Sequence, residues 1–248
     1  MSRRVRHRRD WSDLAELDPM WAIASTPERR FGGWDEPAFA ESGARKAAGL
    51  LKRLDQLGVP ERHGRALDFG CGVGRLSLPL AESFETLVGI DIAPPMIEAA
   101  RARAAEAGVT NAEFLVDGET PEEPASFDLV YCALVLQHQP SADAALHLLE
   151  RLAALVARGG VLVVQVPTRL APRLRLQPGR RAYGALRALG VPPRFLYERL
   201  RLQPMRMVAV PRGRVDACLR AAGLREVRAD ERERHGVRSV TLYAIADR

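Results

Sequence analysis

Lysine and cysteine are scarce in this sequence, and it contains no long hydrophobic run. Of the 37 basic residues only Lys46 and Lys52 are lysines, so arginine supplies almost all of the positive charge. The three cysteines, Cys71, Cys132 and Cys218, are odd in number and form no CxxC pair, which argues against a disulfide scaffold and a cysteine zinc site. No apolar run approaches the roughly 18–20 residues that a membrane-spanning helix needs. These absences favour a protein of the reducing cytoplasm.

The first residues of the chain are strongly basic. Residues 1–9 hold five arginines and no acid, and Arg3-Arg4 resembles the start of a twin-arginine export signal. Such a signal continues with an apolar stretch of roughly 7–15 residues, but Asp10 and Asp13 interrupt this region. We therefore expect a frayed basic tail on a cytoplasmic protein. With 248 residues and 47% hydrophobic composition, the chain is long enough to bury a full core.

Short apolar strands alternate with helices from residue 64 onward. This rhythm is typical of an α/β protein with a doubly wound, mostly parallel sheet. We expect seven strands, at residues 65–69, 86–90, 112–116, 127–133, 161–166, 224–229 and 238–246. Helices are expected at residues 41–58, 95–107, 142–157 and 214–222. We divide the chain into an N-terminal tail and aromatic cap segment over residues 1–63 and one α/β domain over residues 64–248.

A glycine-rich turn follows the first predicted strand. In the run 67–74 (LDFGCGVG) an acid, Asp68, ends the strand and Gly70, Gly72 and Gly74 follow at alternate positions. Glycines allow a sharp turn and a close backbone approach to a ligand, and the next helix directs free N–H groups to the same place. Arg75 occupies the position where a dinucleotide-binding loop carries its third glycine. An acid at the strand end disfavours a pyrophosphate and suits the ammonium group of an amino-acid ligand.

Acidic residues end three successive predicted strands. Asp91 ends the second strand, 23 residues after Asp68, and Asp117 ends the third. A carboxylate at the position of Asp91 can accept both hydroxyl groups of a ribose, and one at Asp117 can accept from an exocyclic adenine amine. Each acid alone could be a helix cap, but three at the carboxyl edge of one sheet predict a nucleoside-binding site.

These stretches, together with residues 127–138 and 159–167, resemble the class I S-adenosylmethionine-dependent methyltransferases. Within that superfamily the sequence is similar to the small-molecule branch that includes ubiquinone- and menaquinone-pathway methyltransferases. The resemblance implies S-adenosyl-L-methionine as cofactor. It also implies a cofactor site of Asp68, Gly70, Cys71, Gly72, Gly74, Asp91, Ile92, Met96, Asp117, Gly118 and Ala133. Arg45 could bring a cation near the methionine carboxylate, and no His/Asp/Glu spacing suggests a metal.

His138 follows the fourth predicted strand on the substrate side of this site. A neutral imidazole there could take a proton from an acceptor hydroxyl, or it could only cap a helix or shape the pocket, since methyl transfer depends more on alignment than on a base. Gln137 is expected in the pocket wall. Trp34 and Phe39 could close over the acceptor through their aromatic faces or form a packing layer, and packing is favoured for Trp11.

Residues 167–210 interrupt the strand–helix rhythm with six prolines and many arginines. We expect a lid inserted after the fifth strand, with short helices near 180–189 and 194–202. The interval 167–213 carries eleven arginines and a single acid. This charge could hold an acceptor with a carboxylate or phosphate, with Arg206 as the main candidate. Alternatively it is a solvated surface, shared with a dimer partner or an anionic membrane.

The sequence as a whole therefore predicts methyl transfer from S-adenosylmethionine to an oxygen, nitrogen or carbon of a small molecule. An RNA methyltransferase is an alternative that the basic segments raise. The Asn/Asp-Pro-Pro-Tyr/Phe signature of base N-methyltransferases is absent after Phe127-Asp128, however, so no nucleic-acid partner is favoured. A catalytically silent, cofactor-binding relative is a second alternative. Monomer and homodimer stay open.

Overall fold

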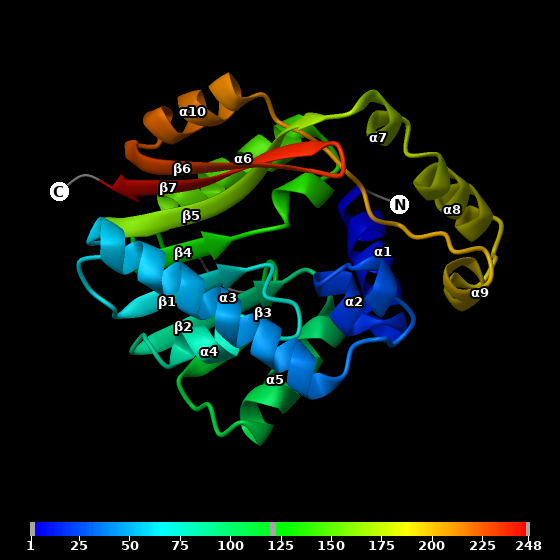
Figure 1. Ribbon diagram of the computed structural model, residues 1–248, viewed down its shortest axis with the longest axis horizontal. Coiled ribbons are helices and arrows are strands. Elements are labelled where there is room, and N and C mark those ends of the chain that lie inside the picture. Colours follow the sequence, from blue (N-terminus) through cyan, green and yellow to red (C-terminus); the bar gives the residue numbers. More distant parts are fainter. Residues whose placement is uncertain (1–2, 120–122, 247–248) are drawn as a thin grey trace.

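The protein is built around one mixed sheet. The computed structural model describes residues 3–119 and 123–246, and within them seven strands are ordered β3-β2-β1-β4-β5-β7-β6 (Figure 1). Strands β1 to β5 pair in parallel, and β7 lies antiparallel between β5 and β6. The strands are β1 Arg65–Phe69, β2 Thr86–Asp91, β3 Ala112–Val116, β4 Phe127–Cys132, β5 Val156–Leu170, β6 Leu224–Arg234 and β7 Val237–Ala246. This confirms the predicted doubly wound, mostly parallel, seven-stranded sheet.

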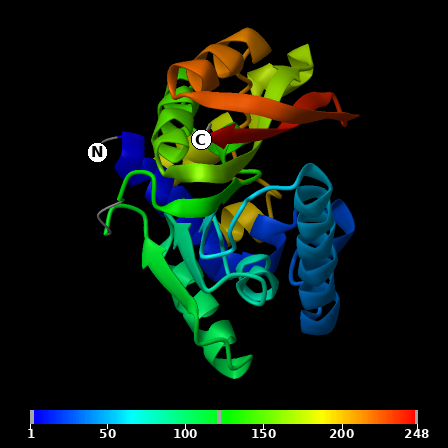
Figure 2. The ribbon, with the colours of Figure 1, turned by 90° about the vertical axis from the view of Figure 1, so that its left-hand side faces the viewer.

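Helices cover both faces of the sheet. Helices α3, α4 and α5 pack on one face and α6 and α10 on the other, and Figure 2 shows α3 standing beside the sheet. In the described residues the helices are α1 Arg3–Leu17, α2 Pro19–Ile23, α3 Glu36–Leu57, α4 Ser77–Ala81, α5 Pro94–Glu106, α6 Ala142–Ala154, α7 Pro172–Leu176, α8 Pro178–Ala188, α9 Pro193–Glu198 and α10 Arg212–Ala221, with 3-10 turns η1 Pro27–Arg29 and η2 Leu136–His138.

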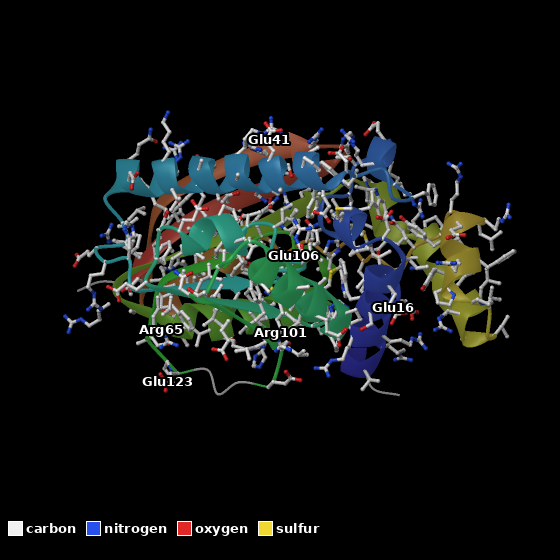
Figure 3. The ribbon with its side chains drawn as sticks, turned by 90° about the horizontal axis from the view of Figure 1, so that it is seen from below. Glu16, Glu41, Arg65, Arg101, Glu106 and Glu123 are labelled. Carbon is white, nitrogen blue, oxygen red and sulfur yellow. The ribbon has the colours of Figure 1, made fainter. Side chains whose placement is uncertain are left out.

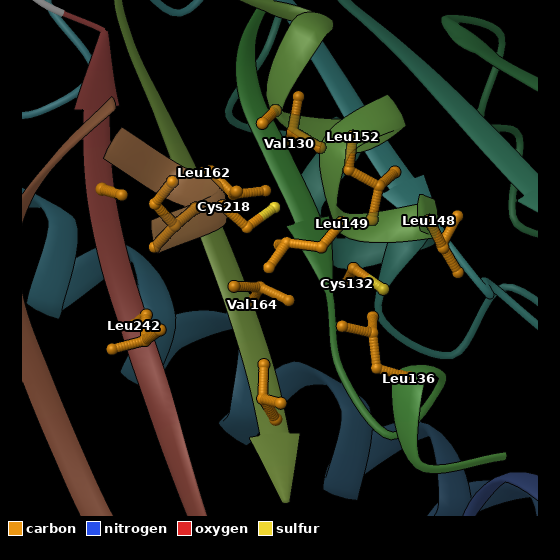
Figure 4. Close-up of a cluster of buried hydrophobic side chains, with 14 of the residues drawn as sticks. Val130, Cys132, Leu136, Leu148, Leu149, Leu152, Leu162, Val164, Cys218 and Leu242 are labelled. Carbon is orange, nitrogen blue, oxygen red and sulfur yellow. The ribbon is translucent and has the colours of Figure 1, made fainter. Parts of the chain in front are cut away.

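The core lies in two layers because side chains alternate across each strand. In β4, Val130 packs with the apolar faces of α6 and α10, whereas its neighbour Tyr131 packs on the side of α3. Figure 4 shows the first layer, where Leu149 of α6 and Cys218 of α10 lie over Val164 of β5. Both faces of the central strands are therefore buried, as their continuous apolar sequence indicated.

Helix α3 lies close to the glycine-rich turn. It begins at the N-cap Asp35, whose carboxylate accepts from the N–H of Ala38, and ends at Gly58 in a left-handed conformation. A Cβ on Gly43 would lie 2.1 Å from the carbonyl oxygen of Arg75, so only glycine permits this approach. The close contact brings the middle of α3, with Lys46, to the edge of the sheet where β1 ends.

The predicted frayed tail is wrong, because residues 3–17 form helix α1. The face of α1 that carries His7, Trp11 and Leu14 follows helical spacing, and Leu14 is buried in a cluster with Trp21 and Met96. Figure 1 shows α1 and α2 beside the carboxyl ends of the parallel strands. The high charge of this segment hid from the sequence analysis a helix that buries Leu14 and Ala15, although Val5 near its start is exposed.

The segment after β5 also differs from the prediction in its bounds. The strand extends to Leu170, beyond the predicted end at 166, because β7 continues the antiparallel ladder to the pair Leu170–Val237. Residues 171–210, called the lid below, then form α7, α8, α9 and an extended stretch. In Figure 1 the lid helices lie beyond α1, at the end of the molecule towards which β4 points.

Candidate functional site

One large cavity of about 710 Å³ opens at the carboxyl ends of β1, β2 and β4. Its walls come from α1, α2, α3, the glycine-rich turn, η2, α6 and residues 203–207 of the lid. An open α/β sheet is expected to bind its ligand at this edge. The cavity brings together most of the residues that the sequence predicted for the site: Asp68, Gly70, Cys71, Gly72, Asp91, Ile92, Met96, Asp117, Ala133, Gln137 and His138.

The glycine-rich turn forms the floor of the cavity. Gly70 has a φ of 82°, and a Cβ there would lie 2.1 Å from Cγ2 of Val135. Gly72, with a φ of 56°, donates its N–H to Oδ2 of Asp91 at 3.0 Å. Gly74 also has a positive φ but lies outside the cavity lining, so its role is to shape the turn. Backbone, rather than side chains, therefore faces the ligand space at Gly70 and Gly72.

Asp91 is fixed in place by two backbone groups. Besides the bond from Gly72, its Oδ1 accepts from the N–H of Ala93 at 2.9 Å. Burial raises the pKa of Asp91 to about 6 against the effect of these hydrogen bonds. Each carboxylate oxygen can accept a second hydrogen bond. The group is thus a pre-oriented acceptor at the cavity wall.

Asp68 lies at the end of β1 with two cations near it. The Ser77 hydroxyl donates to Oδ2 of Asp68 at 2.7 Å, and burial raises the pKa of Asp68 to about 6 against the effects of Ser77, Lys46 and Arg75. Burial and the charge of Arg75 lower the pKa of Lys46 to about 8. Both cations line the cavity. The arrangement offers a carboxylate and two cations to one ligand end, as the α-ammonium and α-carboxylate of an amino acid require.

Lys46 and Arg75 line the cavity, and Arg45, which the sequence analysis considered as a cation of the site, does not. Arg45 is exposed and pairs with Glu41 at 3.5 Å, and Figure 3 shows Glu41 on the outer side of α3. Arg75 donates to Oγ of Ser42 at 3.2 Å, and its buried Nε has no partner among the described residues. The sequence signal for Lys46 was the small-residue run Ser42-Gly43-Ala44, which lets α3 approach the turn.

Asp117 reaches the cavity from the loop after β3 and is held by Arg151 of α6. Nη2 of Arg151 lies 2.6 Å from Oδ1 of Asp117, and Arg8 of α1 donates to the backbone carbonyl of Asp117 at 3.0 Å. Gly118, the next residue, has a φ of 95° and lies outside the cavity lining. The sheet, α6 and α1 therefore meet at this wall.

Both ring nitrogens of His138 are engaged. Nδ1 lies 2.6 Å from the carbonyl oxygen of Arg206, which can only accept, so Nδ1 carries the proton. Nε2 lies 3.0 Å from the amide nitrogen of Gln137, which donates to it. Burial lowers the pKa of His138 to about 4 despite the bond to Arg206. The ring is neutral at pH 7, and it links η2 to the lid.

Helix α1 supplies two cavity residues that the sequence analysis did not assign to the site. The Trp11 ring packs against His138 with centroids 5.1 Å apart. His7 is buried, also lines the cavity, and has its pKa lowered to about 4, first by burial and then by the charge of Arg206. The expectation that Trp11 only packs thus needs correction. The i, i+4 spacing of His7 and Trp11 was the available signal.

Three predicted substrate contacts lie elsewhere. Phe39 is fully buried, and Trp34 packs edge-on against it and donates its indole N–H to the carbonyl of Ala24 at 3.0 Å. Both therefore form a packing layer outside the cavity lining. The Arg206 side chain lines a second, much smaller space together with Asp10, while its carbonyl binds His138. Because residues 3–17 form helix α1 instead of a frayed tail, Asp10 lies near Arg206, which explains why Arg206 lies outside the main cavity.

The sheet order, the glycine-rich turn and the strand-end carboxylates around one cavity match the arrangement that the sequence resemblance implied. They are the features of a class I S-adenosylmethionine-dependent methyltransferase. Residues 66–160 match the family described as "Methyltransferase domain". The chain therefore carries a methyltransferase domain over these residues.

Several known proteins are similar to the chain. A trans-aconitate 2-methyltransferase of Methylobacterium radiotolerans is 38% identical over 154 residues, covering 61% of this chain and 53% of that protein. A ubiquinone biosynthesis O-methyltransferase of Xylella fastidiosa is 34% identical over 146 residues, covering 55% of each. The chain thus spans about half the length of the curated relatives it matches.

A solved structure shares the fold along almost the whole chain. It is the magnesium protoporphyrin IX methyltransferase from Synechocystis PCC 6803 with bound SAH, with a TM-score of 0.63 at 20% identity. The alignment covers 96% of this chain and 98% of that one. In the part of the chain that the structure describes, no helix is long and apolar enough to cross a membrane, and no group of three His, Cys, Asp or Glu side chains could hold a metal ion.

Proposed function

We propose that this protein transfers a methyl group from S-adenosylmethionine to a small-molecule acceptor. The observation that carries the proposal is the convergence of Asp68, Asp91 and Asp117 on one cavity beside the glycine-rich turn. Each carboxylate faces a different part of the ligand space, and each matches a donor that this cofactor presents. The relatives that act on small molecules support the same reaction class.

The residues of the cavity fit this cofactor. Asp91 would accept from the ribose hydroxyls, since its oxygens are already oriented by backbone N–H groups. Asp68 would accept from the α-ammonium, and Lys46 and Arg75 would bind the α-carboxylate. The adenine would lie against Ile92 and Met96, with Asp117 near its amine. Gly70, Cys71 and Gly72 would border the ligand through backbone atoms.

The acceptor half of the cavity lies between α1, η2 and the lid. Bound cofactor supplies an electrophilic methyl group, and the protein's task is to align the acceptor with it and exclude water. The wall here is formed by Trp11, Gln137, Gln203, Met205 and Met207. These side chains are uncharged, so we propose that the acceptor is recognised by shape and neutral hydrogen bonds rather than by a bound anion.

His138 is proposed to position the lid rather than to act as a strong base. Its Nδ1 holds the carbonyl of Arg206, and Nε2 already accepts from Gln137. The lowered pKa makes the ring a weak proton acceptor at pH 7. His138 would thus fix Met205 and Met207 against the acceptor.

Calorimetry with S-adenosylmethionine tests the proposal. We expect micromolar affinity, about −8 kcal/mol. Asp91→Ala should weaken it by about 1.5–3 kcal/mol, because charge-assisted hydrogen bonds to the ribose are lost. Unchanged affinity in this variant, or tighter binding of a nicotinamide cofactor, would contradict the assignment. Transfer of labelled methyl groups into a fractionated cell extract, with mass analysis of the product, would then identify the acceptor.

We further propose that the protein works in a reducing compartment such as the cytoplasm. All three cysteines are free and buried. Burial raises the pKa of the Cys71 thiol in the cavity wall, which keeps it protonated and unreactive.

A further inference from the structure

The lid exposes large apolar side chains on its outer side. Leu189, after α8, is 82% exposed and Phe195 of α9 is 48% exposed, and Leu176 and Leu200 are exposed as well. The next two residues of α9, Leu196 and Tyr197, are in contrast fully buried. The helix thus directs one apolar pair inward and leaves Phe195 outside, which is a costly arrangement unless something covers it.

Three of these residues, Leu189, Phe195 and Leu200, come from the end of α8, from α9 and from the loop that follows, which form the tip of the lid. Leu189 lies in the short link between the two helices, and Leu200 donates its N–H to the carbonyl of Phe195 at 3.2 Å. Phe31 joins the tip from the N-terminal segment, with its ring 5.1 Å from that of Tyr197 and the guanidinium of Arg201 over it at 5.5 Å. Phe31 is itself exposed. Figure 1 shows α8 and α9 projecting from the body of the molecule.

The lid as a whole is strongly basic. Between residues 171 and 202 the exposed arginines are Arg173, Arg175, Arg181, Arg194, Arg199 and Arg201. The single acid of this interval, Glu198, pairs with Arg194. The inner side is balanced instead, since Arg187 pairs with Asp13 of α1 at 3.0 Å. Among the described residues, Arg187 on the inner side has an acidic partner, whereas of the six exposed arginines only Arg194 does.

We infer that this outer side of the lid, hereafter the docking surface, binds the face of an anionic phospholipid bilayer. Arginines attract the negative headgroups, while side chains such as Phe195 and Leu189 can enter the boundary between headgroups and acyl chains. The inference goes beyond the proposed methyl transfer and does not depend on it. It also accounts for the many arginines of the lid. The side chains proposed to surround the acceptor are uncharged, so these arginines have no anionic ligand in the cavity.

Two other occupants fit less well. A second copy of the chain, related by a two-fold axis through this surface, would bring arginines against arginines. Single-stranded RNA binds through aromatic stacking platforms, but leucines make up three of the four large exposed hydrophobic residues of the lid. A bilayer satisfies both the charge and the aliphatic side chains.

Docking would also bring the bilayer near the acceptor half of the cavity. Gln203, Met205 and Met207 line the cavity and follow Leu200 and Arg201 directly in the chain. The segment that lines this part of the cavity therefore continues within a few residues from the docking surface.

Flotation with vesicles tests the inference on the full-length protein. The probes are vesicles of phosphatidylcholine alone and of phosphatidylcholine with one quarter phosphatidylglycerol. We expect binding only to the anionic vesicles, reduced by high salt. The triple variant Arg181→Gln, Arg199→Gln, Arg201→Gln and the double variant Leu189→Ser, Phe195→Ser should each lower binding by about tenfold or more.

The matched control changes charge by the same amount elsewhere. Lys52→Gln, Arg158→Gln, Arg220→Gln removes three exposed cations on α3, β5 and α10 and should leave vesicle binding within about twofold of wild type. Binding to neither vesicle, or equal losses in the control, would overturn the inference. Binding of an RNA oligonucleotide, or self-association of the protein, that is lost only in the lid variants would also overturn the inference. Retained affinity for S-adenosylmethionine shows that each variant is folded and separates this outcome from failure of the proposed function.

Discussion

The Nδ1 atom of His138 donates a hydrogen bond to the carbonyl oxygen of Arg206 across 2.6 Å. This contact joins the turn after β4 to the extended stretch of the lid. The Trp11 ring packs on the same imidazole, so α1 is joined to the contact as well. Three segments far apart in the sequence therefore meet at one neutral histidine, and together they enclose the acceptor half of the cavity.

Substitution of His138 separates positioning from base catalysis. Asn can place an amide donor near the position of Nδ1 but cannot accept a proton as an imidazole does. If the ring positions the lid, His138→Asn should keep most of the turnover, while His138→Ala should raise the acceptor KM and increase tryptic cleavage at lid arginines. If the ring is a general base, both variants should lose about 10²–10⁴ in kcat. Equal losses in both, with the wild-type rate of lid cleavage, would contradict positioning.

Lys46 and Arg45 form a matched pair of adjacent cations. Lys46→Met should weaken S-adenosylmethionine binding about tenfold, because a charge-assisted contact to the α-carboxylate is lost. Arg45→Met should leave it unchanged, since Arg45 faces solvent and pairs with Glu41. Calorimetry with methylthioadenosine, which lacks the amino-acid part, is the control. A loss of affinity for that ligand in Lys46→Met would place Lys46 elsewhere than at the carboxylate.

Cofactor affinity should fall in mild acid. Burial gives Asp68 and Asp91 pKa values of about 6, so at pH 5 only about one tenth of each carboxyl is ionised, and affinity should fall about tenfold for each group. Titration calorimetry between pH 7.5 and 5 measures this change. Asp91→Asn should flatten the dependence by removing one titrating group. An affinity that is constant over this range would show that the carboxylates do not bind the cofactor in their charged form.

Thermal unfolding over the same range is the companion measurement. A folded pKa raised above the ordinary value means that protonation of Asp68 and Asp91 stabilises the fold as pH falls from about 6 towards 4. His7 and His138 act oppositely, because their pKa values of about 4 make folding less favourable as pH falls below 6.5. The two effects oppose each other, so His138→Asn should make the protein more acid-resistant relative to wild type.

Trp11 and Trp34 should differ in what their loss affects. Trp11→Leu should raise the acceptor KM several-fold with the cofactor Kd unchanged, because Trp11 lines the cavity beside His138. Trp34→Leu should instead lower the stability by about 1–3 kcal/mol, since its ring packs on Phe39 and its N–H is bonded to Ala24. Steady-state kinetics and chemical denaturation give the two readouts. An acceptor KM raised by Trp34→Leu alone would reverse the assignment.

The sequence by itself determined the sheet and the strand-end residues that line the cavity. Residues such as Asp68, Gly70 and Asp91 stand at the ends of short strands, and the carboxyl ends of parallel strands meet at one edge whatever surrounds them. Their positions along the chain therefore fix their positions in space to a good approximation. Local rules also located most helices within a few residues.

The tertiary structure decided which other side chains line the cavity and which do not. Lys46 and Arg45 are neighbours in the sequence, and only the close packing at Gly43 turns one of them to the cavity. The charged N-terminal segment became helix α1 because Leu14 and Trp11 find partners in distant segments, which no local pattern contains. Arg206 faces Asp10 for the same reason. Contacts between segments far apart in the chain depend on packing, and packing is specified only when all of them are present.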